Sequence, residues 1–171
     1  MFQAAVLTIS DKGSQGLRED RSGPAVCQFL TESGYEVIFT TIIPDEKEVI
    51  KDKFNELARQ NVPLIVSTGG TGFSKRDVTP EALQEVCQRM VPGFGEAMRY
   101  ASSQITDRAW LSRACAGILE NSVLVALPGS PKAAVENLEA IIHPLKHGLE
   151  ILLGIDSECA VPDHHHQEDH H

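Results

Sequence analysis

The sequence is poor in several features that mark particular classes of protein. No stretch is long and apolar enough to span a membrane, and we expect no signal peptide, because the first residues lack a charged region followed by a long apolar run. Positive charge is also scarce, since 15 lysines and arginines stand against 24 aspartates and glutamates, a formal net charge of −9. This balance argues against a general nucleic-acid-binding protein, although an acidic protein can still hold a phosphate locally.

Cysteine is sparse, and the cysteines show no C-x-x-C spacing typical of metal or redox sites. They are Cys27, Cys87, Cys115 and Cys159. We interpret them as reduced, mostly buried thiols of a cytoplasmic protein, because disulfides persist mainly in oxidising compartments. With 171 residues, 42% of them hydrophobic, the chain is long enough for a single domain with a substantial core.

Short apolar strands alternate with helical segments along the chain. Runs rich in β-branched residues predict strands at 3–9, 35–43, 63–66 and 122–127. Helical patterns lie between and after them, at 20–34, 50–58 and 80–89, less regularly over 94–113, and from Pro131 onward, where Pro144 should kink or split the helix. This alternation predicts an α/β fold of three layers, α/β/α, with a mostly parallel central sheet covered by helices on both faces.

The chain is organised around a glycine-rich stretch, residues 67–80, which directly follows the predicted strand 63–66. Its glycines permit positive φ, so backbone N–H groups can converge on an anion near a helix N-terminus. Thr79 and Pro80 predict the start of that helix, as a hydroxyl N-cap and a proline at the first helical position. Because the spacing is neither that of a P-loop nor that of a dinucleotide fingerprint, the loop alone leaves two interpretations open, a phosphate site or a tight solvated turn.

Three other predicted strands also end in polar residues. These lie at Ser10-Asp11, at Pro44-Asp45 and at 128–130. The carboxyl ends of parallel strands meet at one edge of a sheet, where ligands bind in α/β folds. The coincidence of these residues with the glycine-rich loop favours a phosphate-binding pocket over a solvated turn.

Several motifs, taken in order, resemble those of the molybdopterin adenylyltransferases, the Mog-type bacterial proteins related to a plant G domain and to the amino-terminal domain of gephyrin. The matching segments are 10–13 with 19–24, 68–72 with 76–81, 94–99, 111–114 and 127–131. The resemblance extends to about residue 154. We therefore predict one molybdopterin- and ATP-binding domain over residues 1–154.

The resemblance implies the fold of the molybdenum cofactor biosynthesis proteins and the activity of a nucleotidyltransferase. ATP and molybdopterin would give adenylyl-molybdopterin and pyrophosphate, with Mg²⁺ as the cofactor. The terminal phosphate of the pterin side chain would attack the α-phosphorus of ATP, a reaction that depends on positioning and charge neutralisation. The resemblance also implies a homotrimer and suggests a molybdenum insertase as a partner.

By this resemblance, Asp45 and Asp77 are the catalytic aspartates and the candidate magnesium ligands. The structural alternatives, which we favour less, are an Asx turn for Asp45 and a charge at a helix N-terminus for Asp77. The other residues that the resemblance assigns to nucleotide or pterin binding are Ser10, Asp11, Thr68, Gly69, Gly70, Thr71, Gly72, Glu96, Arg113, Pro128, Gly129 and Ser130.

Some of these assignments have ordinary structural alternatives. Ser130 would also N-cap the helix that starts at Pro131. Glu96 could form a surface ion pair with Arg99, three residues further along a helix, and Arg113 could be a solvated charge. Two further cations of the glycine-rich loop, Lys75 and Arg76, we interpret as solvated.

Residues 155–171 fall outside the resemblance and are acidic and rich in histidine. We predict a flexible tail without a catalytic role, although its histidines could bind a divalent metal adventitiously. The alternative to an enzyme is a non-catalytic molybdopterin-binding carrier or scaffold of the same fold. A hydrolase is disfavoured, because no G-x-S-x-G elbow surrounds Ser130.

Overall fold

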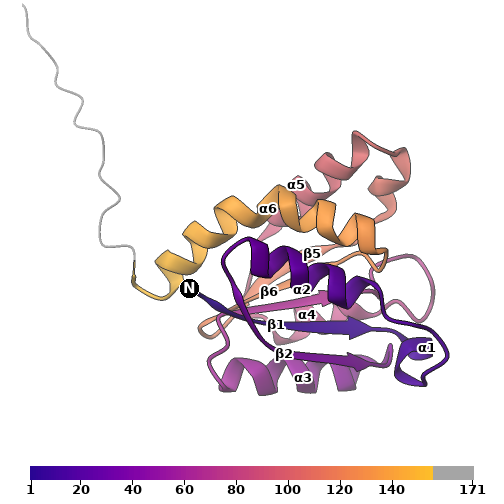
Figure 1. Ribbon diagram of the computed structural model, residues 1–171, viewed down its shortest axis with the longest axis horizontal. Coiled ribbons are helices and arrows are strands. Elements are labelled where there is room, and N and C mark those ends of the chain that lie inside the picture. The colour runs from indigo at the N-terminus through magenta and orange to yellow at the C-terminus, as the bar shows by residue number, and fades with distance from the viewer. Residues whose placement is uncertain (156–171) are drawn as a thin grey trace, which may run out of the picture.

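The computed structural model describes residues 1–155, and Figure 1 shows a sheet with helices on both of its faces. The strands are β1 (Gln3–Ile9), β2 (Glu36–Ile43), β3 (Leu64–Thr68), β4 (Arg89–Met90), β5 (Cys115–Leu119) and β6 (Ser122–Leu127). The helices are α1 (Asp11–Ser14), α2 (Ser22–Glu32), α3 (Lys47–Arg59), α4 (Thr79–Val86), α5 (Pro92–Ser103), the 3-10 helix η1 (Asp107–Leu111) and α6 (Pro131–Leu152). The predicted three-layer α/β/α architecture is confirmed.

The two helix layers follow from the alternation of side chains along buried strands. In β1, Ala4 and Val6 face a core built with α2, α5 and α6, whereas Ala5, Leu7 and Ile9 face a core built with α3 and α4. Strands β3 and β6 alternate in the same way and are buried along their whole lengths. Because neither face of these strands meets solvent, their sequences are nearly continuous apolar runs.

The order of the strands, β2-β1-β3-β6-β5-β4, creates a topological switch between β1 and β3. The chain passes from β1 through α2 to β2 at one edge, then crosses β1 to place β3 on its other side. Thr8 pairs with Thr68, which in turn pairs with Leu127, so β1, β3 and β6 are parallel and end level with one another. The loops that follow these strands therefore begin side by side, where α/β folds bind ligands.

Strands β4 and β5, which run antiparallel to their neighbours, were not predicted from the sequence. The β5 segment contains small residues, and its strand conformation comes from pairing with β6 rather than from a strong local preference. Gly117 lies at a close approach in this strand, because a Cβ there would contact Cys87 and the Arg89 carbonyl at 2.7 and 3.1 Å. The irregular helical region expected over 94–113 is α5 followed by η1.

Two local predictions differ from the structure. The N-cap of α4 is Val78, while Thr79 is the first helical residue and donates its hydroxyl to the Gly69 carbonyl at 3.0 Å. Helix α6 runs without interruption past Pro144, so the proline does not split it. Pro144 is exposed, whereas Ile141 and Leu145 on either side are fully buried, so core packing holds both parts of the helix in place.

The cysteines within residues 1–155 are Cys27, Cys87 and Cys115, and each is a half-buried free thiol. Burial raises the pKa of Cys87 to about 12 and that of Cys115 to about 11. Cys159 and the predicted histidine-rich tail lie outside the described residues, apart from Ile155. Of the helices described here, none has the length and apolar content to cross a bilayer.

Candidate active site

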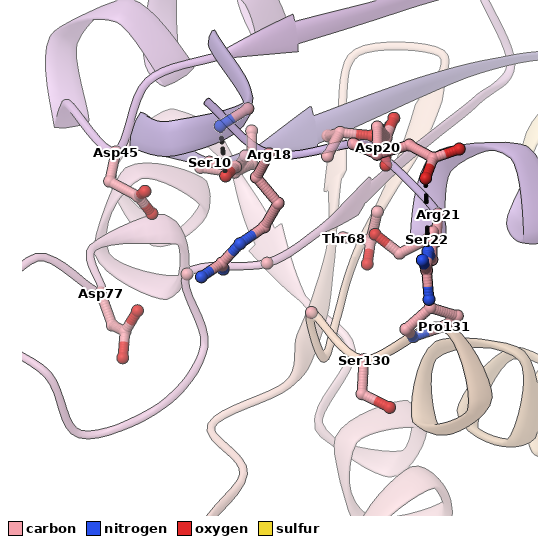
Figure 2. Close-up of a pocket in the computed structure, with 17 residues that line it drawn as sticks. Ser10, Arg18, Asp20, Arg21, Ser22, Asp45, Thr68, Asp77, Ser130 and Pro131 are labelled. Atoms are coloured by element: carbon pink, nitrogen blue, oxygen red, sulfur yellow. Dashed lines mark hydrogen bonds and ion pairs between the residues drawn. The ribbon is translucent and has the colours of Figure 1, made fainter. Parts of the chain in front are cut away.

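The polar strand exits surround one pocket of about 650 Å³ at the carboxyl end of the sheet (Figure 2). The predicted site residues that line it are Ser10, Asp45, Thr68, Gly69, Gly70, Asp77, Gly129 and Ser130. Those that do not line it are Asp11, Thr71, Gly72, Glu96, Arg113 and Pro128. Figure 2 shows the side chains of Asp45 and Asp77 on the same side of the pocket.

Asp45 is held in place by an exchange of hydrogen bonds with Asp11. The amide of Asp11 donates to Oδ2 of Asp45 at 2.9 Å, and the amide of Asp45 donates to Oδ1 of Asp11 at 3.0 Å. Asp11 opens the short helix α1, which Ser10 caps by accepting a hydrogen bond from the Gly13 amide. The Asp45 carboxylate therefore bonds to a distant loop rather than forming a local Asx turn.

The two carboxylates of this pair have opposite electrostatic environments. Hydrogen bonds from the Arg76 side chain lower the pKa of Asp11. Burial raises the pKa of Asp45, the Asp11 amide opposes that rise, and the nearby charges of Asp11 and Asp77 add to it. A cation in the pocket would therefore stabilise the charged form of Asp45.

The glycine-rich loop brings the backbone of β3 close to that of β1. Gly69 has φ +107, and a Cβ there would overlap the Ile9 carbonyl oxygen. Gly70 has φ +70, and a Cβ there would overlap the buried hydroxyl of Thr79. Both positions lie in the left-handed region that disfavours L side chains, so glycine is needed for conformation and for space.

Asp77 lies at the far end of this loop, directly before α4. Its Oδ2 accepts a hydrogen bond from the Ser74 amide at 2.9 Å. A Cβ on Gly72 would lie 2.8 Å from the same oxygen, so the loop folds closely around this carboxylate. The two site aspartates thus each use Oδ2 to accept one backbone amide hydrogen bond, and within residues 1–155 their Oδ1 atoms form none.

Arg113 braces the loop from outside the pocket. Its Nε donates to the Gly72 carbonyl at 2.9 Å, and one terminal nitrogen donates to the Asp77 carbonyl at 2.7 Å. The other terminal nitrogen forms an ion pair with Glu81, and the Arg113 amide donates to the Thr71 carbonyl at 2.9 Å. Arg113 is therefore not a simple solvated charge, and it contacts the loop instead of the pocket.

The exit of β6 supplies the opposite wall of the pocket. The hydroxyl of Thr68 donates to the Pro128 carbonyl at 2.6 Å, which ties the ends of β3 and β6 together. A Cβ on Gly129 would lie 3.3 Å from the Cα of Gly69, so the two loops pass closely. Ser130 N-caps α6 by accepting a hydrogen bond from the Ala133 amide, and it also lines the pocket.

Glu96 lies on α5, does not line the pocket, and does not form the ion pair with Arg99 that was the alternative to a binding role. The Arg99 guanidinium donates instead to the carbonyl oxygens of Ser112 and Ala114, at 3.3 and 2.6 Å. This contact fixes the segment between η1 and β5 against α5. The structure therefore separates Glu96 from the other predicted site residues.

Sequence analysis missed a polar wall of the pocket formed by Arg18, Asp20 and Arg21, in the segment before α2. Asp20 accepts hydrogen bonds from the hydroxyl of Thr8 at 2.7 Å and from the amide of Gly23 at 2.9 Å. Residues 19–24 belong to one of the motifs that carry the family resemblance, and this match could have indicated the loop. Nothing local in the sequence would have shown that the loop faces the pocket.

The pocket suits a magnesium ion that is bound together with phosphates. Asp45 and Asp77 offer oxygen ligands, and Mg²⁺ is usually held by one or two carboxylates, substrate phosphates and water. Within residues 1–155, no group of three or more histidine, cysteine or acidic side chains could hold a metal by itself. The donor set fits a shared metal site rather than a complete protein cage.

The chain matches a known protein family over most of its length. Residues 5–147 match the family described as the probable molybdopterin binding domain. The chain belongs to that family. Molybdopterin adenylyltransferase from Helicobacter pylori is 40% identical over 152 residues, which cover 87% of this chain and 86% of that protein. The enzyme of the same name from Escherichia coli K12 is 39% identical and covers 82% of this chain and 73% of its own length.

Solved structures of this family share the fold of the chain. The molybdopterin biosynthesis enzyme MoaB from Thermus thermophilus is 41% identical, with a TM-score of 0.86, over 90% of this chain and 98% of that one. The tungsten cofactor synthesizing protein MoaB from Pyrococcus furiosus is 35% identical, with a TM-score of 0.82, and the match covers 88% of this chain and 96% of that one. A bifunctional molybdenum cofactor biosynthesis protein of Synechococcus elongatus is 40% identical, but the match covers only 48% of its length.

Proposed function

We propose that this protein is a molybdopterin adenylyltransferase of molybdenum cofactor biosynthesis, which converts ATP and molybdopterin into adenylyl-molybdopterin and pyrophosphate. The observation that carries the proposal is the match over most of the chain to relatives that bear this name, at about 40% identity. The pocket supports it independently, because two carboxylates and a glycine-rich loop meet at the switch point of a parallel sheet.

The chemistry would be a displacement at the α-phosphorus of ATP. An oxygen of the molybdopterin phosphate forms the new bond to this phosphorus, and the bond to the bridging oxygen of pyrophosphate breaks. The chain's own contribution is to hold both phosphates in line and to donate hydrogen bonds to them. The hydroxyls of Ser10 and Ser130 each accept a backbone hydrogen bond, so each keeps its O–H to donate into the pocket.

Asp45 and Asp77 would hold magnesium through their Oδ1 atoms, which accept no hydrogen bond within residues 1–155. When bound, the ion neutralises charge on the nucleotide phosphates during the transfer. Burial raises the pKa of Asp45, and a bound cation would stabilise the charged form of this carboxylate.

We extend the proposal to a cytoplasmic homotrimer that works with a molybdenum insertase. An oligomer is supported by apolar side chains of the α5–η1 region that are more than half exposed: Tyr100, Ile105, Trp110 and Leu111. A functional partner is supported by relatives in which the matched segment is part of a longer chain, the Synechococcus bifunctional protein and the gephyrin of Dictyostelium discoideum.

The deciding experiment is pyrophosphate release by the purified protein with ATP and magnesium, in the presence and absence of molybdopterin. We expect release that depends on molybdopterin, together with an adenylylated pterin detected by mass spectrometry. Tight pterin binding without release would contradict the enzyme and support the carrier. Mass measurement of the native protein in solution tests the trimer separately.

A further inference from the structure

The two site aspartates come from different loops, and a continuous series of contacts joins them. Asp45 exchanges two backbone–carboxylate hydrogen bonds with Asp11, at 2.9 and 3.0 Å. The Arg76 guanidinium donates two hydrogen bonds to the same Asp11 carboxylate, from Nε at 2.9 Å and from a terminal nitrogen at 3.0 Å. Arg76 directly precedes Asp77 in the chain, so the series ends at the second aspartate.

Among the hydrogen bonds and ion pairs described within residues 1–155, only those of the Arg76 side chain join segment 73–76 to a distant part of the chain. Within residues 1–155, the other hydrogen bonds of segment 73–76 are local ones, such as that from the Arg76 amide to the hydroxyl of Ser74. The side chain of Phe73 is exposed to solvent and does not anchor the segment. Without the arginine, Asp77 would still be held by Arg113 on one side, but segment 73–76 would have no described hydrogen bond to the side that carries Asp45.

The geometry points to Arg76 as a positioning residue that fixes the separation of Asp45 and Asp77 through Asp11. Arg76 is not among the residues that line the pocket, and two of its three guanidinium nitrogens are engaged by Asp11. A fork that meets both oxygens of one carboxylate restricts orientation as well as distance, which a single-point lysine contact does not. The expected effect of Arg76 on turnover rests on the proposed adenylyl transfer, whereas its effect on the geometry of Asp11 and Asp45 does not.

If Arg76 and Asp11 formed only an ordinary surface ion pair, different results would be expected. Such pairs contribute little to stability, and removing one changes neither the geometry nor the rate of a reaction nearby. Arg76 is 59% exposed, so stability alone would not distinguish the two cases. The two cases must therefore be distinguished by turnover and by the order of the Asp11 and Asp45 loops.

The test compares Arg76→Gln with Lys75→Gln in the full-length protein. Both variants remove one positive charge from adjacent exposed positions, but within the described chain the Lys75 side chain forms no hydrogen bond or ion pair. In Arg76→Gln we expect kcat to fall about 10- to 100-fold, as for other small misplacements of reacting groups. The KM for ATP should stay within about twofold, because Arg76 does not line the pocket proposed to hold the nucleotide. Lys75→Gln should match the wild type in both constants.

A double-mutant cycle with Asp11→Asn sharpens the test. Asparagine keeps an oxygen that can accept the Asp45 amide, but it cannot receive both nitrogens of Arg76. Arg76→Gln and Asp11→Asn should therefore be non-additive, and the double variant should be no slower than the slower single variant. Arg76→Lys should recover only part of the rate, since it restores charge without the fork.

Hydrogen exchange at the Asp11 and Asp45 amides provides a readout that needs no activity. Arg76→Gln should accelerate exchange at both amides at least about tenfold, and Lys75→Gln should not. Unchanged exchange in Arg76→Gln would overturn the inference, as would a raised KM for ATP with kcat unaltered, which would make Arg76 a ligand contact. Absence of turnover in the wild type would contradict the proposed function instead, and the exchange data alone would then decide on Arg76.

Discussion

The two halves of the sheet contribute to the pocket in different ways. The parallel half, β2-β1-β3-β6, ends in loops that supply its lining, from Ser10 at one exit to Ser130 at another. The antiparallel half, β5 and β4, supplies no lining residue. Its contribution is Arg113, just before β5, which holds the loop that carries Asp77.

The difference follows from the direction of the strands, which decides whether their loops reach the pocket. Parallel strands bring several loops to one edge, so residues far apart in the sequence can act on one ligand. Antiparallel strands send successive loops to opposite ends, so β5 and β4 extend the sheet and anchor neighbouring segments. The exposed apolar residues of α5 and η1 also lie beside this second half, away from the chemistry.

The largest effect should come from the parallel half, at Asp77. We expect Asp77→Ala to reduce adenylylation at least about 100-fold, because it removes a charge that would help to neutralise the phosphates. Molybdopterin should still bind, since the change does not touch the core. Steady-state pyrophosphate release and pterin binding measure the two effects.

Asp52→Ala is the matched control for Asp77→Ala. Asp52 is exposed on α3, and its side chain forms no hydrogen bond or ion pair in the described structure. Its variant should behave as the wild type. Unchanged turnover in Asp77→Ala would remove this residue from the chemistry.

The backbone of the parallel half should be nearly as sensitive, at Gly70. Gly70→Ala places a side chain at φ +70 against the hydroxyl of Thr79, and we expect a loss of about 1–3 kcal/mol of stability together with activity. Gly34→Ala imposes a similar φ, +89, with no atom within 4 Å of the new Cβ. Urea unfolding of both variants separates collision from strain, and equal losses would show that Thr79 is not the obstacle.

The antiparallel half should show its role at Arg113. Arg113→Met leaves the carbonyl oxygens of Gly72 and Asp77 without their donor, which should cost about 1–3 kcal/mol of stability and lower kcat. Arg89→Met removes the same charge from exposed β4 and should change neither. If Arg113→Met instead weakened pterin binding at unchanged stability, the substrate contact implied by the resemblance would be supported.

The sequence predicted the parallel half better than the antiparallel half. Buried parallel strands are continuous apolar runs such as 122–127, and these are visible without any tertiary information. Strand β5 contains small residues and depends on its pairing with β6, while β4 has only two residues, too few for a pattern. Their conformation is set by neighbours, and local preference cannot reveal it.

The site shows the same division. That Asp45 and Asp77 would lie on one edge followed from their places after parallel strands, while their catalytic roles stay predictions. The contacts that hold them could not be predicted, because Arg76 reaches Asp11 across 65 positions of the sequence, and Arg113 reaches Gly72 across 41. The Arg76 side chain is largely exposed, as expected for a solvated cation, but its ion pair with Asp11 could not be predicted from the sequence.

The smallest effect at neutral pH, and the clearest separation of the two halves, should come from alkaline unfolding. Tyr35 is buried in the core beneath α2 and α6, where its hydroxyl has no partner among the described residues, and burial raises the pKa of Tyr35 to about 12. The unfolded chain loses the phenol proton near pH 10, whereas the folded chain keeps it up to about pH 12. The free energy of unfolding is therefore unaffected by Tyr35 below pH 10 and falls as the pH rises from about 10 to 12.

Tyr35→Phe should leave stability at pH 7 nearly unchanged and should remove roughly 2 kcal/mol of the loss between pH 10 and 12. Cys115, in the antiparallel half, has a pKa raised from 9.0 to about 11, so its contribution should fade from about pH 9. Cys115→Ala should therefore flatten the earlier part of the curve and Tyr35→Phe the later part. Urea unfolding at steps from pH 8 to 12 measures both, and identical curves for Tyr35→Phe and the wild type would show that the phenol ionises without opposing the core around it.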